Sequence, residues 1–299
     1  KELKAVKEKY IKLKQELNIT GTERLETTYE QAQETMGENF YGVEEIKNAF
    51  GFEIGGSDTP PIPYSAEMLK KAEELGEMLI LRVDVDERGN PLTMKRINQI
   101  MEERMDKDKD GKLLYAVSWY KEETFYKEMS LKTEWKLVGK NFVPDILSEK
   151  DRDGKFIKDS RGNNYIHQTK MLREYLKFVE SLSEEEIKGC SDELLKKLSE
   201  KIGVDWESQQ ITDSNKYDEN WKEVARELSE MLINKNHRRM PVEVIYDWIL
   251  QFKKTKERGI LEKNYDWTTT LSSGGRLVLL GIADRDGVYV GYDYPDYRY

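Results

Sequence analysis

The sequence predicts an α+β fold, in which helices and short strands are mixed without regular alternation. Several segments carry apolar residues at helical spacing. Two short apolar runs near the carboxyl end, Leu277–Leu280 and Val288–Val290, are separated by an Asp286-Gly287 pair, which is a strand–turn–strand signal. The irregular order of these elements argues against a sheet of alternating βαβ units.

The amino-terminal region is expected to be helical. Apolar residues of the first 18 positions follow the three–four spacing of a coiled-coil seam, at Leu3, Val6, Tyr10, Leu13 and Leu17. Two heptads fit a helix docked on the body as well as an oligomer stalk. A second helical stretch is expected from Thr28 to Phe50, and the segment Gly55–Pro63 is rich in Gly and Pro, which predicts a boundary. We therefore expect a helical extension over 1–58 and a second domain over 59–299.

The second domain is expected to alternate irregularly between helices and strands. Ser65 can cap a helix that ends at Gly76, and Pro241 suits the first turn of a later helix. Residues 183–236 are highly charged and are expected to be a helical insertion, with Ser183 and Ser191 as caps. The other expected elements are strands at Met78–Val85, Leu113–Ser118 and Trp135–Lys140, and helices at Leu92–Met105, Asn164–Leu182 and Val242–Phe252.

Composition limits the classes of function. The 299 residues carry a net charge of −9, which argues against nucleic acid as a partner because phosphate binding needs concentrated Lys and Arg. No apolar run is long enough to span a membrane. No signal peptide is visible and Cys190 is alone, so we expect a cytoplasmic protein without disulfides. The first residue is Lys and not Met, which leaves export open.

The sequence offers no catalytic constellation, metal site or cofactor motif. His167 and His237 have no metal-ligand spacing, and Cys190 has neither histidine near it in sequence. The segment Asp106–Gly111 resembles the start of a calcium-binding loop, but its twelfth position is Val117 where a carboxylate is needed, so we expect a polar turn. We therefore expect no catalytic residues, no metal and no cofactor.

The tract from Trp267 to Tyr299 is the most informative part of the chain. Five tyrosines crowd its last eleven positions, mixed with Gly and Asp. Recognition surfaces use this mixture because Tyr covers a large area while freezing only two torsions, although Tyr is also a good strand former. We expect Trp135 and Trp248 to lie in the core, and Trp267 to anchor the tract.

The region from Ile62 to Tyr299, about four-fifths of the chain, resembles the variable proteins of diversity-generating retroelements, in the form found in uncultivated small bacteria. Stretches in matching order carry the resemblance. They are Pro63–Met68, Leu79–Asp84, Lys112–Tyr115, Ser118–Tyr120, Trp135–Lys140, Tyr165–Thr169, Met240–Asp247, Tyr265–Thr268, Ser272-Ser273 and Gly287-Val288.

The resemblance implies a C-type lectin-like fold that displays a hypervariable ligand-binding face. In that family an error-prone reverse transcriptase rewrites adenine-containing codons near the 3′ end of the gene. The implied scaffold positions are Trp267, Ser272, Ser273, Gly281, Gly287, Val288 and Val290. The implied ligand-binding positions are Thr269, Thr270, Leu271, Arg276, Leu279, Ile282, Ala283, Tyr289, Gly291, Tyr292, Asp293, Tyr294, Tyr297, Arg298 and Tyr299.

The expected function is therefore non-enzymatic recognition of a protein or surface ligand, which the sequence does not identify. Family members continue past the position of Tyr299 with a further strand, and without it a sheet edge would lie exposed beside the binding face. Two alternatives stay open. One is a lectin-fold oxidase related to formylglycine-generating enzymes, which the single Cys190 disfavours; the other is a structural protein that forms homo-oligomers through its amino-terminal helix.

Overall fold

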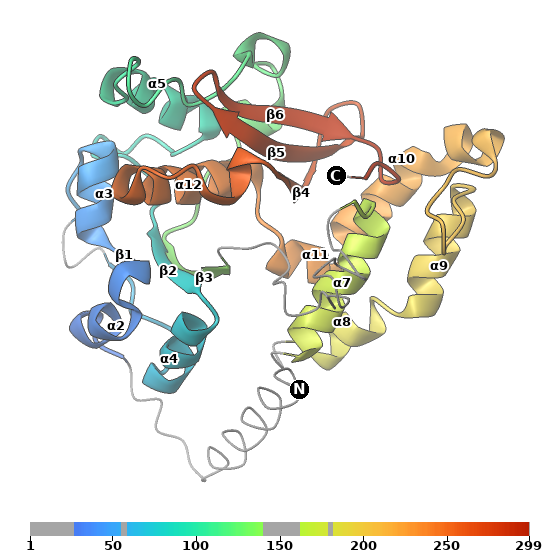
Figure 1. Cartoon of the computed structure of the whole chain (residues 1–299), viewed down its shortest axis with the longest axis horizontal. Coiled ribbons are helices and arrows are strands. Elements are labelled where there is room, and N and C mark those ends of the chain that lie inside the picture. The colour runs from blue at the N-terminus through green and yellow to red at the C-terminus, as the bar shows by residue number, and fades with distance from the viewer. Residues whose placement is uncertain (1–26, 55–58, 140–161, 179–181, 299) are drawn as a thin grey trace, which may run out of the picture.

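The computed structural model describes residues 27–54, 59–139, 162–178 and 182–298, and these form a mixed α+β structure (Figure 1). Two three-stranded sheets occur in these ranges, with strand orders β1-β2-β3 and β4-β5-β6. In the first, β1 and β2 are parallel and β2 and β3 antiparallel, whereas the second is an antiparallel meander. The strands are β1 (Phe40–Tyr41), β2 (Glu77–Arg82), β3 (Glu134–Gly139), β4 (Tyr265–Leu271), β5 (Leu277–Asp284) and β6 (Gly287–Asp293).

Helices surround both sheets, and those numbered α7 to α11 gather beside the carboxyl-terminal sheet (Figure 1). The helices are α2 (Tyr29–Met36), α3 (Val43–Phe50), α4 (Ala66–Glu74), α5 (Met94–Arg104), α6 (Thr124–Lys127), α7 (Tyr165–Phe178), α8 (Glu184–Lys188), α9 (Asp192–Lys201), α10 (Ser214–Glu230), α11 (Leu232–His237) and α12 (Pro241–Thr255). None of these described helices has the length and apolar character that crossing a bilayer requires.

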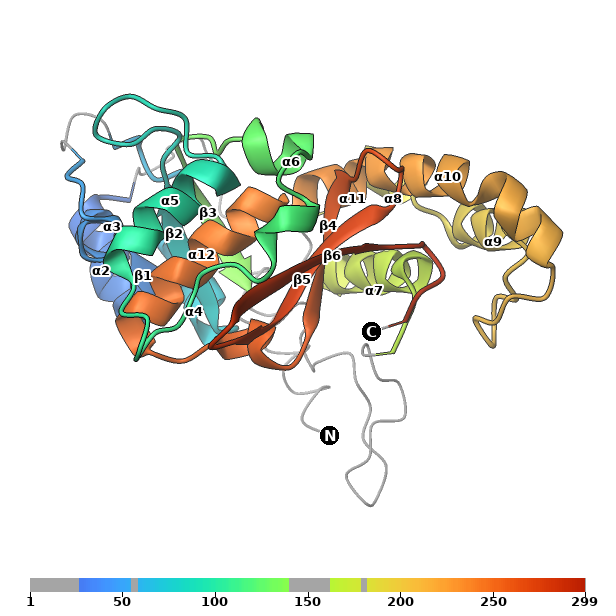
Figure 2. The same cartoon turned by 90° about the horizontal axis from the view of Figure 1, so that it is seen from above.

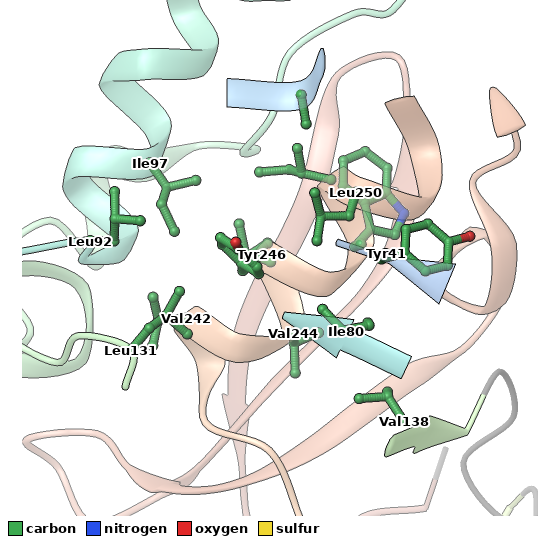
Figure 3. Close-up of a cluster of buried hydrophobic side chains, with 14 of the residues drawn as sticks. Tyr41, Ile80, Leu92, Ile97, Leu131, Val138, Val242, Val244, Tyr246 and Leu250 are labelled. Atoms are coloured by element: carbon green, nitrogen blue, oxygen red, sulfur yellow. The ribbon is translucent and has the colours of Figure 1, made fainter. Parts of the chain in front are cut away.

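Helix α12 is the centre of the molecule and runs between the two sheets (Figures 1 and 2). Ten of its fifteen residues are buried, so the helix is covered on nearly every side, as a core helix should be. The hydroxyl of Tyr246 donates to the carbonyl of Leu81 in β2 at 3.1 Å. Figure 3 shows side chains of α12 packed against β1, β2 and the amino-terminal part of α5, among them Val242, Val244, Tyr246, Leu250, Tyr41, Ile80, Leu92 and Ile97.

Most of the expected elements are confirmed, as is the α+β class, while the C-type lectin-like assignment stays a prediction. Ser65, Ser183 and Ser191 each accept a hydrogen bond from the backbone three residues on and cap α4, α8 and α9. Pro241 begins α12, and residues 183–236 are largely helical, as expected. Trp135 and Trp248 are buried in the core, as expected, and Trp267, which was expected to anchor the carboxyl-terminal tract, is buried as well.

The single helix expected from Thr28 to Phe50 is wrong. The chain forms α2, then a 3₁₀ turn η1 (Gly37–Asn39), the short strand β1 and finally α3. Gly37 has a φ of 52°, a left-handed conformation that interrupts a helix and suits glycine. Phe40 and Tyr41 then pair with Leu79 and Ile80, so tertiary pairing overrides local helical propensity.

The expected domain boundary after residue 58 stays a prediction, and the described residues 27–54 pack in the same core as α12. The rings of Phe50 and Tyr246 stack with centroids 4.9 Å apart. Ile46 and Phe40 lie in the same buried cluster. The coiled-coil pattern within residues 1–18 lies outside the described residues.

The strand expected at Leu113–Ser118 is reduced to an isolated bridge. Leu114 pairs with Val288 of β6, through the bonds Val288 N to Leu113 O at 2.8 Å and Tyr115 N to Val288 O at 3.0 Å. Ala116 then adopts a left-handed φ of 43°, and the chain turns into the 3₁₀ helix η3 (Val117–Trp119). This turn carries Tyr115 and Trp119 along the edge of β6.

The calcium-like segment is a polar turn, as expected. The Asp106 carboxylate accepts hydrogen bonds from the backbone of Asp108 and Lys109. Asp110 is paired with Lys253 at 3.0 Å and Lys256 at 3.3 Å, so lysine ammonium groups occupy its oxygens. Across the described ranges no three His, Cys, Asp or Glu side chains are grouped to hold a metal ion.

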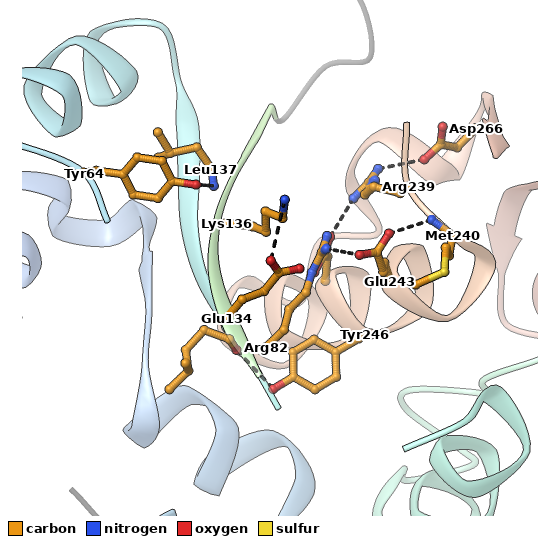
Figure 4. A network of polar contacts seen from close by, with 12 residues as sticks. Tyr64, Arg82, Glu134, Lys136, Leu137, Arg239, Met240, Glu243, Tyr246 and Asp266 are labelled. Carbon is orange, nitrogen blue, oxygen red and sulfur yellow. Dashed lines mark hydrogen bonds and ion pairs between the residues drawn. The ribbon is translucent and has the colours of Figure 1, made fainter. Parts of the chain in front are cut away.

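A buried ionic network joins the two sheets through α12 (Figure 4). Arg82 of β2 donates to both carboxylate oxygens of Asp247, at 3.0 and 2.6 Å, and also to Glu243. Arg239 donates to Asp247 at 3.1 Å and to Asp266 of β4 at 2.8 Å. Each guanidinium is thus held between two carboxylates, which is the arrangement that a buried charge requires.

Asp266 is the most perturbed carboxyl of this network. Burial raises its pKa to about 6, and the nearby Asp247 adds to the rise, although Arg239 and Arg238 oppose it. The folded protein therefore holds a proton on Asp266 at a pH where the unfolded chain has lost it.

We predict that Asp247→Asn lowers the free energy of unfolding by about 3 kcal/mol, because two buried guanidinium groups lose a shared counter-charge. Urea denaturation at neutral pH measures the change. The control is Glu122→Gln, which removes an exposed ion pair with Lys127 and should cost less than about 0.5 kcal/mol. Equal effects of the two substitutions would contradict a structural role for the network.

A second prediction concerns pH. Because the folded pKa of Asp266 is raised, its contribution to stability is full below about pH 4 and is lost as the pH rises through about 6. Wild-type protein should therefore show a fall in stability of roughly 2 to 3 kcal/mol from this group across that window. In Asp266→Asn the fall should be absent, as urea denaturation at several pH values would show; an unchanged slope would assign it to another group.

Candidate binding surface at the carboxyl-terminal tract

The β4–β6 sheet is a rigid frame because both of its faces are buried. Val288 and Val290 of β6 point into the cluster around α12. Leu279 of β5 and Trp267 of β4 point into a second cluster, formed with α7, α9 and α10. Trp267 is packed edge-to-face on Tyr165 of α7, with centroids 5.5 Å apart.

Two glycines of the frame are required by close backbone approaches. A Cβ atom on Gly281 would lie 2.1 Å from the carbonyl oxygen of Asn264. At Gly287, where φ is 117°, it would lie 2.5 Å from the carbonyl carbon of Leu114. Side chains larger than hydrogen would therefore push β5 away from β4 and β6 away from the 113–115 segment.

The two serines of the β4–β5 turn also have structural roles. The Ser272 hydroxyl accepts from the backbone N–H of Arg276 at 3.2 Å. Ser273 donates to the Glu123 carboxylate from its backbone at 2.7 Å and its hydroxyl at 2.8 Å. Every position that the resemblance implies to be scaffold is thus buried, sterically constrained or hydrogen-bonded.

Seven side chains form a continuous partly exposed surface along β6 and past its carboxyl end, which we call the aromatic band. Each member touches the next through a ring contact. In spatial order the band is Tyr115, Tyr289, Trp119, Tyr292, Arg276, Tyr294 and Trp221.

The contacts within the band are close enough to hold its shape. Trp119 lies between two β6 tyrosines, with ring centroids 6.0 Å from Tyr289 and 5.1 Å from Tyr292. The guanidinium carbon of Arg276 lies 5.3 Å from the Tyr292 ring and 4.8 Å from the Tyr294 ring. Arg276 also donates to the Tyr294 hydroxyl at 3.0 Å. Trp221 of α10 is the last member of the band, and its ring centroid lies 4.7 Å from that of Tyr294.

The band can bind by stacking, by cation–π attraction and by phenolic hydrogen bonds. Tyr115 is 46% and Trp119 is 38% exposed, and the other members are half-buried. Burial, with the charge of Asp293, raises the pKa of Tyr289, so its phenol keeps its proton at neutral pH and can donate a hydrogen bond. Rings fixed at their base with open edges are typical of binding anchors.

The structure brings only some of the implied binding residues into this band. Arg276, Tyr289, Tyr292 and Tyr294 belong to it. Leu279 and Ala283 are a correction: both are fully buried, because Leu279 packs beside Trp267 and Ala283 lies in the α12 core. Neither can touch a ligand while the sheet is folded.

The remaining implied residues differ in accessibility. Thr270 and Gly291 are buried, and the Gly291 Cα lies directly beneath the Tyr289 ring, where a Cβ would meet a ring carbon at 2.6 Å. The half-buried ones are Thr269, Leu271 and Asp293, and the exposed ones are Ile282, Tyr297 and Arg298. Tyr299 lies outside the described residues.

Sequence reasoning missed Tyr115, Trp119 and Trp221 as site residues. Tyr115 and Trp119 lie in two stretches that carry the family resemblance, but they precede the carboxyl-terminal tract by about 150 residues. The isolated bridge between Leu114 and Val288 brings Tyr115 and Trp119 to β6. Because the bridge joins two distant segments, no local sequence pattern predicts it.

The residues weighed for catalysis have structural environments. Burial raises the pKa of the Cys190 thiol to about 11, so it is a poor nucleophile at neutral pH. His237 is paired with Glu186 at 2.9 Å, and His167 lies against Trp206 with ring centroids 4.2 Å apart. None of the three lies in the aromatic band.

Comparisons with protein-family models, curated proteins and solved structures found no match.

Ile282 provides a test of the frame itself. This exposed, β-branched residue has a φ of 45° at an irregularity of β5, a conformation that costs such side chains about 1 to 2 kcal/mol. We predict that Ile282→Asn raises the free energy of unfolding by about 1 kcal/mol, because Asn tolerates this conformation. Thermal and urea denaturation would measure it, and Ile282→Val, which keeps the β-branch, should bring no gain.

Proposed function

We propose that this protein is a non-enzymatic recognition protein that binds a protein or surface ligand through the aromatic band. The observation that carries the proposal is the contrast within one tract. The tyrosines and Arg276 form a continuous accessible surface, whereas the valines, glycines and Trp267 beside them are locked into the frame. A tract that served the core alone would place its rings inside.

The rigidity of the frame favours binding by preformed rings. Tyr289 and Tyr292 are carried by a strand that is buried on both faces, and Trp119 is held against both of them. Few torsions remain to be frozen when a partner binds, so little of the contact energy is lost to ordering. Aromatic and Arg side chains are also the types that contribute most to binding energy.

We further propose that the band is diversified by a retroelement, on the strength of the family resemblance. The resemblance divides the tract into fixed and variable positions, and the division agrees with the frame at Gly281, Gly287, Val288 and Val290. A mutagenic process that spared these positions would change the surface while the fold stayed intact.

Sequencing the coding segment for residues 267–299 in many independent isolates tests diversification without knowledge of the ligand. We expect substitutions at Arg276, Tyr289, Tyr292 and Tyr294, arising at adenines of the template, and none at Trp267, Gly281 or Gly287. A reverse-transcriptase gene and a near-copy of the segment should lie close by. Substitutions spread evenly over frame and band would contradict the proposal.

Binding itself can be tested with a displayed library of random twelve-residue peptides selected on the wild-type protein. Selected peptides should lose about 30-fold or more in affinity for Trp119→Ala, the loss expected when an anchor worth about 2 kcal/mol is removed. Ile211→Ala is a matched control, because Ile211 is similarly exposed but lies outside the band. If neither substitution lowers the affinity of the selected peptides, the binding surface lies outside the aromatic band and the proposal is contradicted.

A further inference from the structure

A second concave site lies away from the aromatic band, between the first sheet and the helices α7 and α11. The cleft has a volume of about 450 Å³. Figure 4 shows part of its wall, where Tyr64 and Lys136 lie opposite Arg239, Glu243 and Asp266. The other wall residues on which the inference rests are Leu137, Leu172, Leu176, Lys235 and Arg238.

The cleft is richer in cations than the protein as a whole. Five Lys and Arg side chains line it against three Asp and Glu side chains, in a chain of net charge −9. Arg82 and Arg239 are neutralised by the buried network described above. The excess positive charge therefore comes from Lys136, Lys235 and Arg238.

These three cations have weak carboxylate pairing or none within the described residues. Lys136 is 3.6 Å from Glu134, and both side chains are more than a third exposed, so water screens the pair. Lys235 and Arg238 form no ion pair there. Arg238 donates from Nε to Asn234 at 2.9 Å and lies 4.3 Å above the Tyr165 ring, which fixes its guanidinium.

Arg238 also has an unused donor. Its Nη2 atom is buried and makes no hydrogen bond within the described residues. Buried polar groups normally have partners, and an unpaired one attached to a cation is especially costly. An anion in the cleft would be attracted to the charge of this guanidinium, and Lys235, three residues earlier and in the last turn of α11, adds a second charge.

The other residues that line the cleft indicate what the rest of the ligand should be. Leu137, Leu172 and Leu176 give the cleft an apolar side, which suits a hydrocarbon body. Glu77, Glu243 and Asp266 lie in the same walls and would repel a second negative charge.

We propose that this cleft binds a small organic carboxylate, a monoanion with an apolar body, whose head group is held by Arg238 and Lys235. The site is separate from the aromatic band and does not depend on the recognition function proposed for it.

Calorimetry on the full chain with sodium hexanoate, hexylamine and inorganic phosphate tests the proposal. Hexanoate should bind, and hexylamine and phosphate should bind at least tenfold more weakly. Arg238→Gln should weaken hexanoate at least tenfold and Lys235→Gln several-fold. Lys235 is exposed, so its variant should fold even if the change at Arg238 disturbs the stacking on Tyr165.

Two controls separate this site from others. Lys222→Gln removes an exposed cation on α10, and Trp119→Ala alters the aromatic band; both should leave hexanoate binding unchanged. Absence of hexanoate binding, equal binding of hexylamine, or tighter binding of phosphate would overturn the proposal. So would hexanoate binding that neither cleft substitution weakens.

Discussion

The pairing of Arg82 with Asp247 is the interaction on which the rest of the arrangement depends. It fixes β2 of the first sheet to α12, and Arg239 extends the same pairing from Asp247 to Asp266 of β4. Ionic groups so deeply buried are a poor source of net stability, but they allow few alternative packings. Here they determine how two small sheets are placed on one helix.

The placement of the second sheet explains how one tract can be core and surface together. Its strands are covered by α12 on one face and by the α7–α10 helices on the other. The tyrosines of β6 and the residues after it, together with Arg276 of the β4–β5 turn, are among the side chains of this tract that reach solvent. An antiparallel sheet commonly buries one face and exposes the other, whereas this sheet is buried on both. The division between the frame and the binding surface follows from that burial.

Local signals predicted much of the fold and only part of the candidate surface. Caps at Ser65, Ser183 and Ser191 and the turn at Asp286-Gly287 are encoded by neighbouring residues, so they could be predicted. The pairing of β1 with β2, and of Leu114 with Val288, joins distant segments and was missed for that reason. The same gap affected the site, because Trp119 reaches Tyr289 and Tyr292 only through that second pairing. Leu279 and Ala283 were misplaced because a family resemblance in one sequence does not show which residues of a strand face the core.

The edge of β6 that does not pair with β5 is partly covered by the 113–115 segment, and this has a consequence for solubility. Tyrosine and valine in alternation form a strand that readily recruits identical strands from other molecules when its backbone is accessible. The Leu114 bridge occupies part of that backbone, and Val290 is only 1% exposed, so the bare sheet edge anticipated beside the binding face is not found there. Substitution of the outward-facing rings would therefore not by itself open this part of the β6 backbone to pairing with another chain.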